Sequence, residues 1–474
     1  MSMVAKRKHS EELNASDELL TLQQAAQKFG KTPSNISYLL SYDRINRYDT
    51  DGKRIEKARN GELRVSRAEL AQYFETLDER VRKRMEQHSS LDMELAFLDV
   101  PERERTKHVH RLHPYLGKFI PQLVEYFLSH YFKQGEVVVD PFCGSGTTLV
   151  QAAEMGINSV GIDISEFNTL IANVKLAHYD LEFMRREVTD IMRRTVGFSE
   201  RVFTGRFVPL VDEAANLVTT SEYLNTWFAK QSLKEILYYE KLIPEYTYQD
   251  LLKVILSRTA RSCRLIYHYE LATPSKPVTE PYVCYKHKGR ICTPIRTIIP
   301  RLKFYSIDTI RRIVEFSKLR KDIDSFVIEG DSQTVDFEKS LPTGWAAAHK
   351  FGGVFSSPPY VGQIDYHEQH RYAYELFGIK RRDEQEIGRK KKGKGGKARK
   401  DYVDGISKVL LNMRNQLPKD AVYFIVANDK LSLYPEIFEK AELKVEKAFN
   451  RPVEDRTERD KRPYSENVFF AKPA

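Results

Sequence analysis

The sequence predicts an α/β protein with a Rossmann-like, doubly wound sheet, and three stretches carry that prediction. Residues 137–140 are three valines followed by an acid, a glycine-rich turn follows, and 149–153 read as a helix. Such a unit brings backbone amides to a ligand at the helix N-terminus. A second apolar strand, 159–164, ends close to an acid, and a third apolar run, 353–355, leads into a proline-rich loop. In this fold class, such strand-end loops form the binding site.

Composition limits the function classes. The chain has 474 residues, 41% hydrophobic and 30% charged, which is enough for two or three domains with cores of their own. A net charge of +10 favours a polyanionic partner, although many proteins without one are also basic. Four irregularly spaced cysteines argue against a disulfide framework. The N-terminus lacks an apolar signal segment and no run is long enough to span a membrane, so we expect a cytoplasmic protein without membrane contact.

The first 105 residues divide into a tail, a small helical domain and a linker. Residues 1–18 are polar and typical of a disordered tail. Within 19–75, a helix ending at Gly30 precedes a second helix with proline in its first turn, which is a helix-turn-helix pattern. A later Asp51-Gly52 turn is typical of a wing, and the stretch resembles the excisionase-like winged helices. A small helical adaptor is the alternative, and 76–105 reads as a charged linker.

A large insertion divides the predicted sheet into 106–177 and 323–474. The second part holds strands predicted at 325–332, 421–427, 445–453 and 467–471, and a strand with its proline-rich loop at 353–360. The stretch between them, 178–322, is far longer than the helix and turn that a doubly wound sheet needs. It is helix-like at 224–242 and 251–264, and then rich in tyrosine and arginine. That composition suits a surface that grips phosphates and contacts bases, with an ordinary helical subdomain as the alternative.

Cysteine and histidine residues in the insertion raise the question of a metal. Cys284, His287 and Cys292, with Cys263 upstream, are suitable ligand types. Their spacing lacks the paired Cys-x-x-Cys knuckle of common zinc sites, and basic residues lie between them. We therefore interpret these cysteines as structural and expect no metal.

Two motifs together carry a resemblance to a known family. Residues 140–147 read Asp-Pro-Phe-Cys-Gly-Ser-Gly-Thr, and residues 357–360 read Ser-Pro-Pro-Tyr. The pair resembles the amino-methylating DNA methyltransferases, which use S-adenosyl-L-methionine. The resemblance covers 112–170 and 323–474, and it implies the seven-stranded sheet of a class I methyltransferase. The large insertion departs from simpler members and leaves the target-recognition region open between 178–322 and the N-terminal domain.

The resemblance implies a role for each motif. Ser357, Pro358, Pro359 and Tyr360 form the expected catalytic loop. The Ser357 hydroxyl and the Pro358 carbonyl would accept hydrogen bonds from the target amine, and Tyr360 would stack on a flipped base. Asp163, at its strand end, would accept the ribose hydroxyls of the cofactor. The expected cofactor-binding residues are His113, Tyr115, Lys118, Asp140, Pro141, Phe142, Gly144, Gly146, Thr147, Asp163, Ile164, Asp331, Ser332 and Ser356.

The first residue of the catalytic motif bears on the target base. Serine occurs mostly in cytosine-N4 members of the family and aspartate or asparagine in adenine-N6 members, so Ser357 favours cytosine N4, with adenine N6 as the alternative. Carbon-5 methylation is disfavoured because no Pro-Cys pair occurs. We expect a site-specific enzyme of a prokaryotic restriction–modification or phage-defence system. The motifs favour less strongly an RNA amino-methyltransferase or a non-catalytic DNA-binding regulator.

Double-stranded DNA is the expected partner, beside a cognate restriction or defence protein, and DNA binding would place the chain at the nucleoid. The segment 365–372 would line the target pocket, contact DNA or simply form the next helix. Residues 389–400 read as a flexible basic loop that orders on DNA phosphate, or as a solvated loop. The candidate DNA-binding residues are Ser34, Ser37, Arg264, Arg290, His367 and Arg371.

Overall fold

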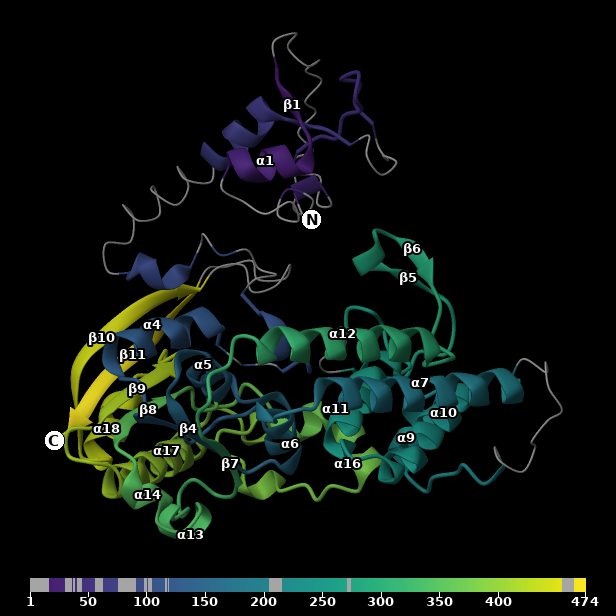
Figure 1. Cartoon of the computed structure of the whole chain (residues 1–474). Coiled ribbons are helices and arrows are strands. Elements are labelled where there is room, and N and C mark those ends of the chain that lie inside the picture. The colour runs from purple at the N-terminus through teal and green to yellow at the C-terminus, as the bar shows by residue number, and fades with distance from the viewer. Residues whose placement is uncertain are drawn as a thin grey trace. The chain divides into compact units, whose positions relative to one another are not determined.

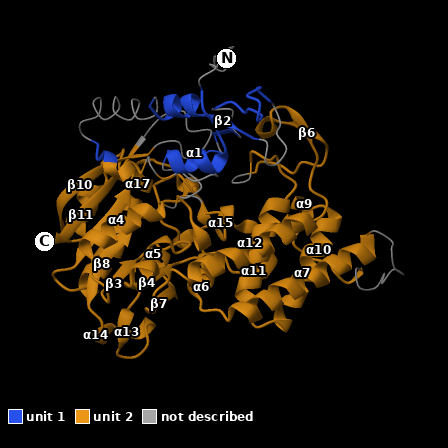
Figure 2. Cartoon of the chain, turned by 45° about the horizontal axis from the view of Figure 1, so that its top comes forward, with its two compact units in different colours: residues 1–93 blue, residues 94–474 orange. Residues whose placement is uncertain are grey.

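The computed structural model divides into two compact units, 1–93 and 94–474, coloured separately in Figure 2. The boundary falls inside the predicted linker. The residues that the structure describes are 17–29, 36, 39–40, 45–55, 63–75, 91–97, 100, 105–115, 117, 119–203, 215–270, 274–453 and 464–474.

The first unit has a small apolar core under a two-stranded sheet. Strand β1 (Leu19–Leu20) pairs antiparallel with β2 (Val65–Ser66), and helix α1 (Leu22–Lys28) starts at a capping box of Thr21 and Gln24. A second described helix spans 67–75. Residues 47–55 turn back at Asp51-Gly52. The Asp49 amide donates to the Lys53 carbonyl, and the Ile55 amide donates to the Arg47 carbonyl. This is the predicted turn, and the winged-helix assignment stays a prediction, since most of the second helix lies outside the described residues.

The second unit contains the predicted seven-stranded sheet, in the order β10-β11-β9-β8-β3-β4-β7 (Figure 1). The middle strands run parallel, whereas β10 and β11 form an antiparallel hairpin against β9. The fold class is therefore confirmed. The strands are β3 (Val137–Asp140), β4 (Asn158–Asp163), β7 (Ser325–Glu329), β8 (Phe351–Ser356), β9 (Val422–Ala427), β10 (Leu443–Val453) and β11 (Tyr464–Pro473).

Helices cover both faces of this sheet because its central strands are apolar on both sides. In β3, Val138 belongs to the apolar cluster on one face of the sheet, together with Phe127 of α4. Val137 and Val139 belong to the cluster on the other face, together with Ile406 of α17. The sheet's helices are α4 (Pro121–Tyr131), α5 (Thr147–Met155), α6 (Glu166–Leu176), α13 (Phe337–Ser340), α14 (Trp345–Ala348), α15 (Tyr366–Gln369), α16 (Arg371–Phe377), α17 (Gly396–Gln416) and α18 (Tyr434–Lys440).

The insertion is mainly helical and lies beyond the β7 edge of the sheet (Figure 1). A single apolar cluster joins its helices to α5 and α6, so it is not a separate core. Its helices are α7 (Leu181–Phe203), α9 (Glu222–Trp227), α10 (Lys230–Leu242), α11 (Gln249–Cys263) and α12 (Ile299–Ser317). Between α11 and α12 the chain forms a small antiparallel hairpin of β5 (Tyr282–Cys284) and β6 (Arg290–Cys292).

Short 3-10 turns complete the fold. The prediction of a flexible basic loop over 389–400 was wrong in part: the chain makes a turn at 390–392 and α17 begins at Gly396, while the Arg389 side chain is buried against Asp383 and Glu384. In the described residues, no helix is long and apolar enough to cross a membrane. The 3-10 turns are η1 (Met93–Ala96), η2 (His108–Arg111), η3 (Ile243–Glu245), η4 (Tyr285–His287), η5 (Asp383–Gln385) and η6 (Lys390–Lys392).

Candidate active site

A pocket with about 870 Å³ of empty space, part of it open to solvent, lies at the carboxyl ends of β3, β4, β7 and β8. Its size suits a nucleoside-sized ligand. The predicted site residues that line it are Tyr115, Asp140, Pro141, Phe142, Gly144, Thr147, Asp163, Ile164, Asp331, Ser332, Ser357, Pro359 and His367.

The glycine loop between β3 and α5 forms the floor of this pocket. Gly144 and Gly146 adopt positive φ angles of 49° and 76°, which other residues rarely take. A Cβ on Gly146 would lie 3.0 Å from the Ala172 side chain, and one on Gly144 would lie 3.0 Å from the Tyr115 ring. The two glycines therefore let the loop turn tightly and leave the first amides of α5 facing the pocket.

Asp140 ties the glycine loop to the end of β8. Its carboxylate accepts bonds from the hydroxyls of Ser356, at 2.5 Å, and Thr148, at 2.6 Å, and from the Phe142 amide. The side chain is buried. Burial raises the pKa of Asp140 to about 6, although the three hydrogen bonds act to lower it. Asp140 and Ser356 were predicted to bind the cofactor, and in the structure Ser356 holds Asp140 rather than lining the pocket.

Asp163, at the end of β4, holds the opposite wall. One carboxylate oxygen accepts the Gly144 amide at 2.9 Å, and the other accepts the Ser165 amide at 2.8 Å and the Asn168 side chain at 3.1 Å. Burial raises its pKa above the usual range. The loops after β3 and β4 are thus joined through one carboxylate.

The ends of β7 and β8 complete the pocket. The Ser332 hydroxyl donates to the Pro141 carbonyl at 2.6 Å, which fastens the loop after β7 to the glycine loop. Asp331 accepts the Gln333 amide at 2.9 Å. These contacts bring residues nearly two hundred positions apart in sequence into one site.

The Ser-Pro-Pro-Tyr loop follows β8 directly. Ser357 and Pro359 line the pocket, whereas Pro358 is buried below it. The Tyr360 hydroxyl donates to Glu466 at 3.0 Å, and that carboxylate pairs with buried Arg451 at 2.9 Å. Glu466 lies on β11, so the closing hairpin of the sheet anchors the tyrosine.

Of the predicted cofactor-binding residues His113, Tyr115 and Lys118, only Tyr115 is described at the pocket. Tyr115 lines it and lies parallel to the rings of Tyr366 and His370, at 5.7 and 5.8 Å between centroids. His113 is fully buried behind it, with Nε2 3.1 Å from the Tyr372 hydroxyl, and burial lowers its pKa well below the usual range. Lys118 lies outside the described residues.

Sequence reasoning missed several pocket residues. Among the described residues, the Ser145 hydroxyl and the Asn168 side-chain carbonyl are buried without a hydrogen-bonding partner. Buried polar atoms are normally paired, so a polar ligand in the pocket fits their placement. Both follow a predicted acid closely, which is the signal that could have found them. The other missed lining residues are Gly117, Phe119, Cys143, Ser165, Gly330, Gln385, Glu386, Ile387 and Val409.

The segment 365–372 forms helices and lines the pocket at the same time. His367 is buried at the pocket wall, with Nδ1 3.2 Å from the Glu386 carboxylate. That carboxylate also accepts the Tyr366 amide at 2.7 Å. Glu386 has no counterpart in the predicted motifs, since it lies beyond α16 on a loop that only the fold returns to the site.

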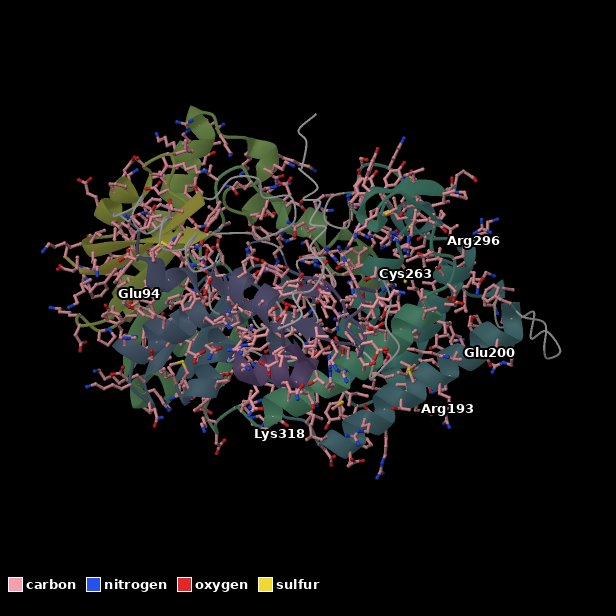
Figure 3. All side chains as sticks on the ribbon, turned by 90° about the horizontal axis from the view of Figure 1, so that it is seen from above. Glu94, Arg193, Glu200, Cys263, Arg296 and Lys318 are labelled. Atoms are coloured by element: carbon pink, nitrogen blue, oxygen red, sulfur yellow. The ribbon has the colours of Figure 1, made fainter. Side chains whose placement is uncertain are left out.

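The predicted DNA-binding residues differ in exposure. Arg264 is buried, with its guanidinium 5.0 Å above the Tyr372 ring, so its side chain is not exposed to a DNA phosphate in this structure. Arg371 is partly exposed and bonded to Glu375, while Arg290 and Arg296 are exposed on the insertion, Arg296 being labelled in Figure 3. Ser34 and Ser37 lie outside the described residues.

Comparison with known proteins places the chain among methyltransferases. A family model for N6/N4 methyltransferases, described as DNA methylase, matches residues 3–173. The type II methyltransferase M.MjaII of Methanocaldococcus jannaschii is 44% identical over 97% of this chain and 98% of its own length. M.BsoBI of Geobacillus stearothermophilus, also a type II methyltransferase, is 25% identical over 58% of this chain and 53% of its own length.

Similarity to solved structures is weaker. The rRNA methyltransferase aviRa of Streptomyces viridochromogenes matches 76% of this chain and 88% of its own with 10% identity and a TM-score of 0.30. The fold assignment therefore rests on the strand order of the sheet itself.

Proposed function

This chain belongs to the family of type II DNA methyltransferases, and from that membership we propose that it methylates the exocyclic N4 of cytosine in double-stranded DNA. It is a site-specific DNA methyltransferase by family. The observation that carries the finer proposal is Ser357, a neutral hydroxyl, on the pocket wall at the end of β8. The proposed setting is a restriction–modification or phage-defence system.

The pocket fits S-adenosylmethionine as the methyl donor. When bound, this cofactor supplies a methyl group on a positively charged sulfur. Asp163 offers an acidic strand end suited to ribose hydroxyls, Ser145 and Asn168 offer unpartnered polar atoms, and the glycine loop allows close approach to the backbone. The expected cofactor-binding residues that line the pocket are retained in this proposal.

The catalytic loop would act by positioning. The lone pair of an exocyclic amine is delocalised into the ring, and hydrogen-bond acceptors localise it on nitrogen. We assign that role to the Ser357 hydroxyl and the Pro358 carbonyl, which the rigid proline pair holds in one direction. Alignment of amine and methyl group could contribute about 7–11 kcal/mol to lowering the barrier.

Tyr360 would supply the face on which the flipped base stacks. Its hydroxyl is held by Glu466, which Arg451 holds in turn, so the ring has a defined orientation before DNA binds. Base–aromatic stacking is worth roughly 1–3 kcal/mol. The Tyr360–Glu466 bond therefore belongs to the proposed target site.

Binding of the duplex would involve the insertion and the first unit. The exposed Arg290 and the partly exposed Arg371 are the proposed phosphate contacts that the structure describes, and His367 is reassigned from DNA contact to the pocket wall. The turn at Asp51-Gly52 and the helix at 67–75 suit a small DNA-contacting domain.

The test is to incubate the chain with unmethylated duplex DNA and methyl-labelled S-adenosylmethionine, digest the DNA, and identify the labelled nucleoside by mass spectrometry. N4-methylcytosine would support the proposal, and N6-methyladenine would keep the enzyme class but overturn the assignment from Ser357. Label in RNA and not in DNA would overturn the DNA target. A Ser357→Ala, Tyr360→Ala double variant is the control for the catalytic loop.

A further inference from the structure

Four side chains of the insertion converge on one point outside the pocket. They are His268, which follows α11, Cys284 at the end of β5, His287 in the tight turn after it, and Cys292 at the end of β6. One ligand atom from each lies within 4.8 Å of all the others. We propose that this cluster is a structural zinc site that holds the β5–β6 hairpin to the end of α11.

The distances within the cluster are close to those between the ligands of a tetrahedral cation. Zinc binds sulfur at about 2.3 Å and imidazole nitrogen at about 2.0–2.1 Å, so tetrahedral ligand atoms lie roughly 3.3–3.8 Å apart. The Cys284 sulfur lies 3.7 Å from His268 Nδ1, and the Cys292 sulfur lies 3.0 Å from His287 Nδ1. The two imidazole rings are 4.8 Å apart between centroids. The first separation lies within the tetrahedral range and the second is shorter than it, so each sulfur already faces one nitrogen.

The local backbone is shaped for such a site. Lys288 and Gly289 both have positive φ, and the Gly289 amide donates to the Cys284 carbonyl at 3.0 Å, which brings His287 back over the strand end. The Tyr282 hydroxyl accepts the His268 amide at 3.1 Å. This bond fixes the fourth ligand beside the hairpin although it comes from another segment.

The hairpin is short and largely exposed, and the rings of Tyr282 and Tyr285 contact those of Tyr267 and Tyr269. Each strand has three residues, and an isolated two-stranded hairpin is marginal in water. Val283, Tyr285 and Ile291 are 58%, 79% and 73% exposed, and Cys284 is the one buried residue of the two strands. A metal is the usual means by which so small an element holds a single structure.

The donor set selects the ion. Two thiolates and two imidazoles suit zinc, and four protein ligands leave no open position for a catalytic water. Cys263, labelled in Figure 3, belongs to α11 and is fully buried outside the cluster. This geometry conflicts with the expectation of no metal. The spacing argument missed the site because one ligand, His268, precedes Cys284 by sixteen positions and replaces the second cysteine of a knuckle.

The test is the metal content of the full chain, purified without chelators or immobilised-metal resin, by plasma mass spectrometry. We expect about one zinc per chain in the wild type and in Cys263→Ala, and at least a tenfold loss in the Cys284→Ser, Cys292→Ser double variant. Cys263→Ala is the matched control, because it removes a cysteine of the same insertion that the cluster does not use.

Cobalt gives a readout that does not depend on how the variants fold. Wild-type chain stripped of metal and titrated with Co²⁺ should show the visible absorption of tetrahedral cobalt with thiolate charge transfer. Zinc that survives the double variant would overturn the proposal. So would a wild-type chain that takes up neither metal, or one in which Cys284 and Cys292 form a disulfide.

Discussion

The pocket at the carboxyl ends of β3, β4, β7 and β8 and the β5–β6 hairpin are both clusters of polar side chains, on very different supports. In the pocket, Asp140 and Asp163 are held by hydroxyls and amides from neighbouring strand ends. Those strands belong to the seven-stranded sheet, with apolar clusters on both faces. At the hairpin, the four-residue cluster draws Cys284 and Cys292 from two three-residue strands with mostly exposed side chains, and its two histidines from outside the strands.

The difference indicates in which of the two regions a bound group would stabilise the local structure. The pocket side chains are hydrogen-bonded to one another, so contacts within the protein define the shape of the pocket. The hairpin cluster lies on a short, largely exposed element, so the proposed ion would contribute to folding as well as occupy the site. Removing the cofactor should therefore leave the local structure of the pocket unchanged, whereas removing the proposed ion should destabilise the hairpin.

Removal of the Ser357 hydroxyl tests whether the rate of methyl transfer can fall while cofactor binding in the pocket is unchanged. For Ser357→Ala we expect kcat to fall about 10²–10³-fold, the range for removing one preorganised polar contact from a transition state. Cofactor affinity should stay within about twofold, because Asp140 and Asp163 are untouched. Radiolabel transfer and calorimetry measure the two, with exposed Ser317→Ala as control. A fall in kcat of less than about threefold would contradict the assigned role.

The buried carboxyl of Asp140 predicts a pH-dependent stability. Its pKa is about 6 in the folded chain and about 3.9 when unfolded, a difference of about 3 kcal/mol. Because the folded state binds the proton more tightly, stability from this group falls as pH rises from about 4 to 6 and then stays level. Urea unfolding of the wild type and Asp140→Asn should diverge by that amount across this window. Parallel pH profiles would contradict it.

Asp163 tests the proposed ribose contact. With Asp163→Asn we expect affinity for S-adenosylmethionine to weaken about 10–100-fold, since hydrogen bonds to a charged group are worth about 1.5–3 kcal/mol. Calorimetry measures the affinity. The matched control is Asp336→Asn, which changes an exposed acid that caps the short helix α13 and should bind cofactor normally. Equal affinity in all three proteins would remove Asp163 from the cofactor site.

Chelation gives the smallest expected effect on the pocket and so sharpens the contrast between the two regions. Removing a hairpin metal should leave cofactor affinity within about twofold, because the pocket shares no residue with the cluster. Cleavage at Lys286 and Lys288 by a lysine-specific protease should rise at least about tenfold, as expected from a local loss of about 1.4 kcal/mol. An unchanged cleavage rate would show that the hairpin holds without the ion.

Local sequence determined much of the core. Three valines before Asp140 encode a strand that is apolar on both faces, and Gly144 and Gly146 encode a turn that other residues cannot make. The strands near 159–163, 325–329, 353–356 and 422–427 follow in the same way from their apolar runs. Such features depend on neighbours in sequence, which is why their positions and the fold class could be predicted.

Tertiary structure alone decided which distant side chains meet. Glu466 reaches Tyr360 because β11 inserts beside β9, Glu386 reaches the pocket because a loop returns after α16, and Arg264 is buried because α16 packs on α11. His268 joins Cys284 for the same reason. Periodicity reveals which face of an element is apolar, but not which element covers it, so these contacts arise only when the chain folds.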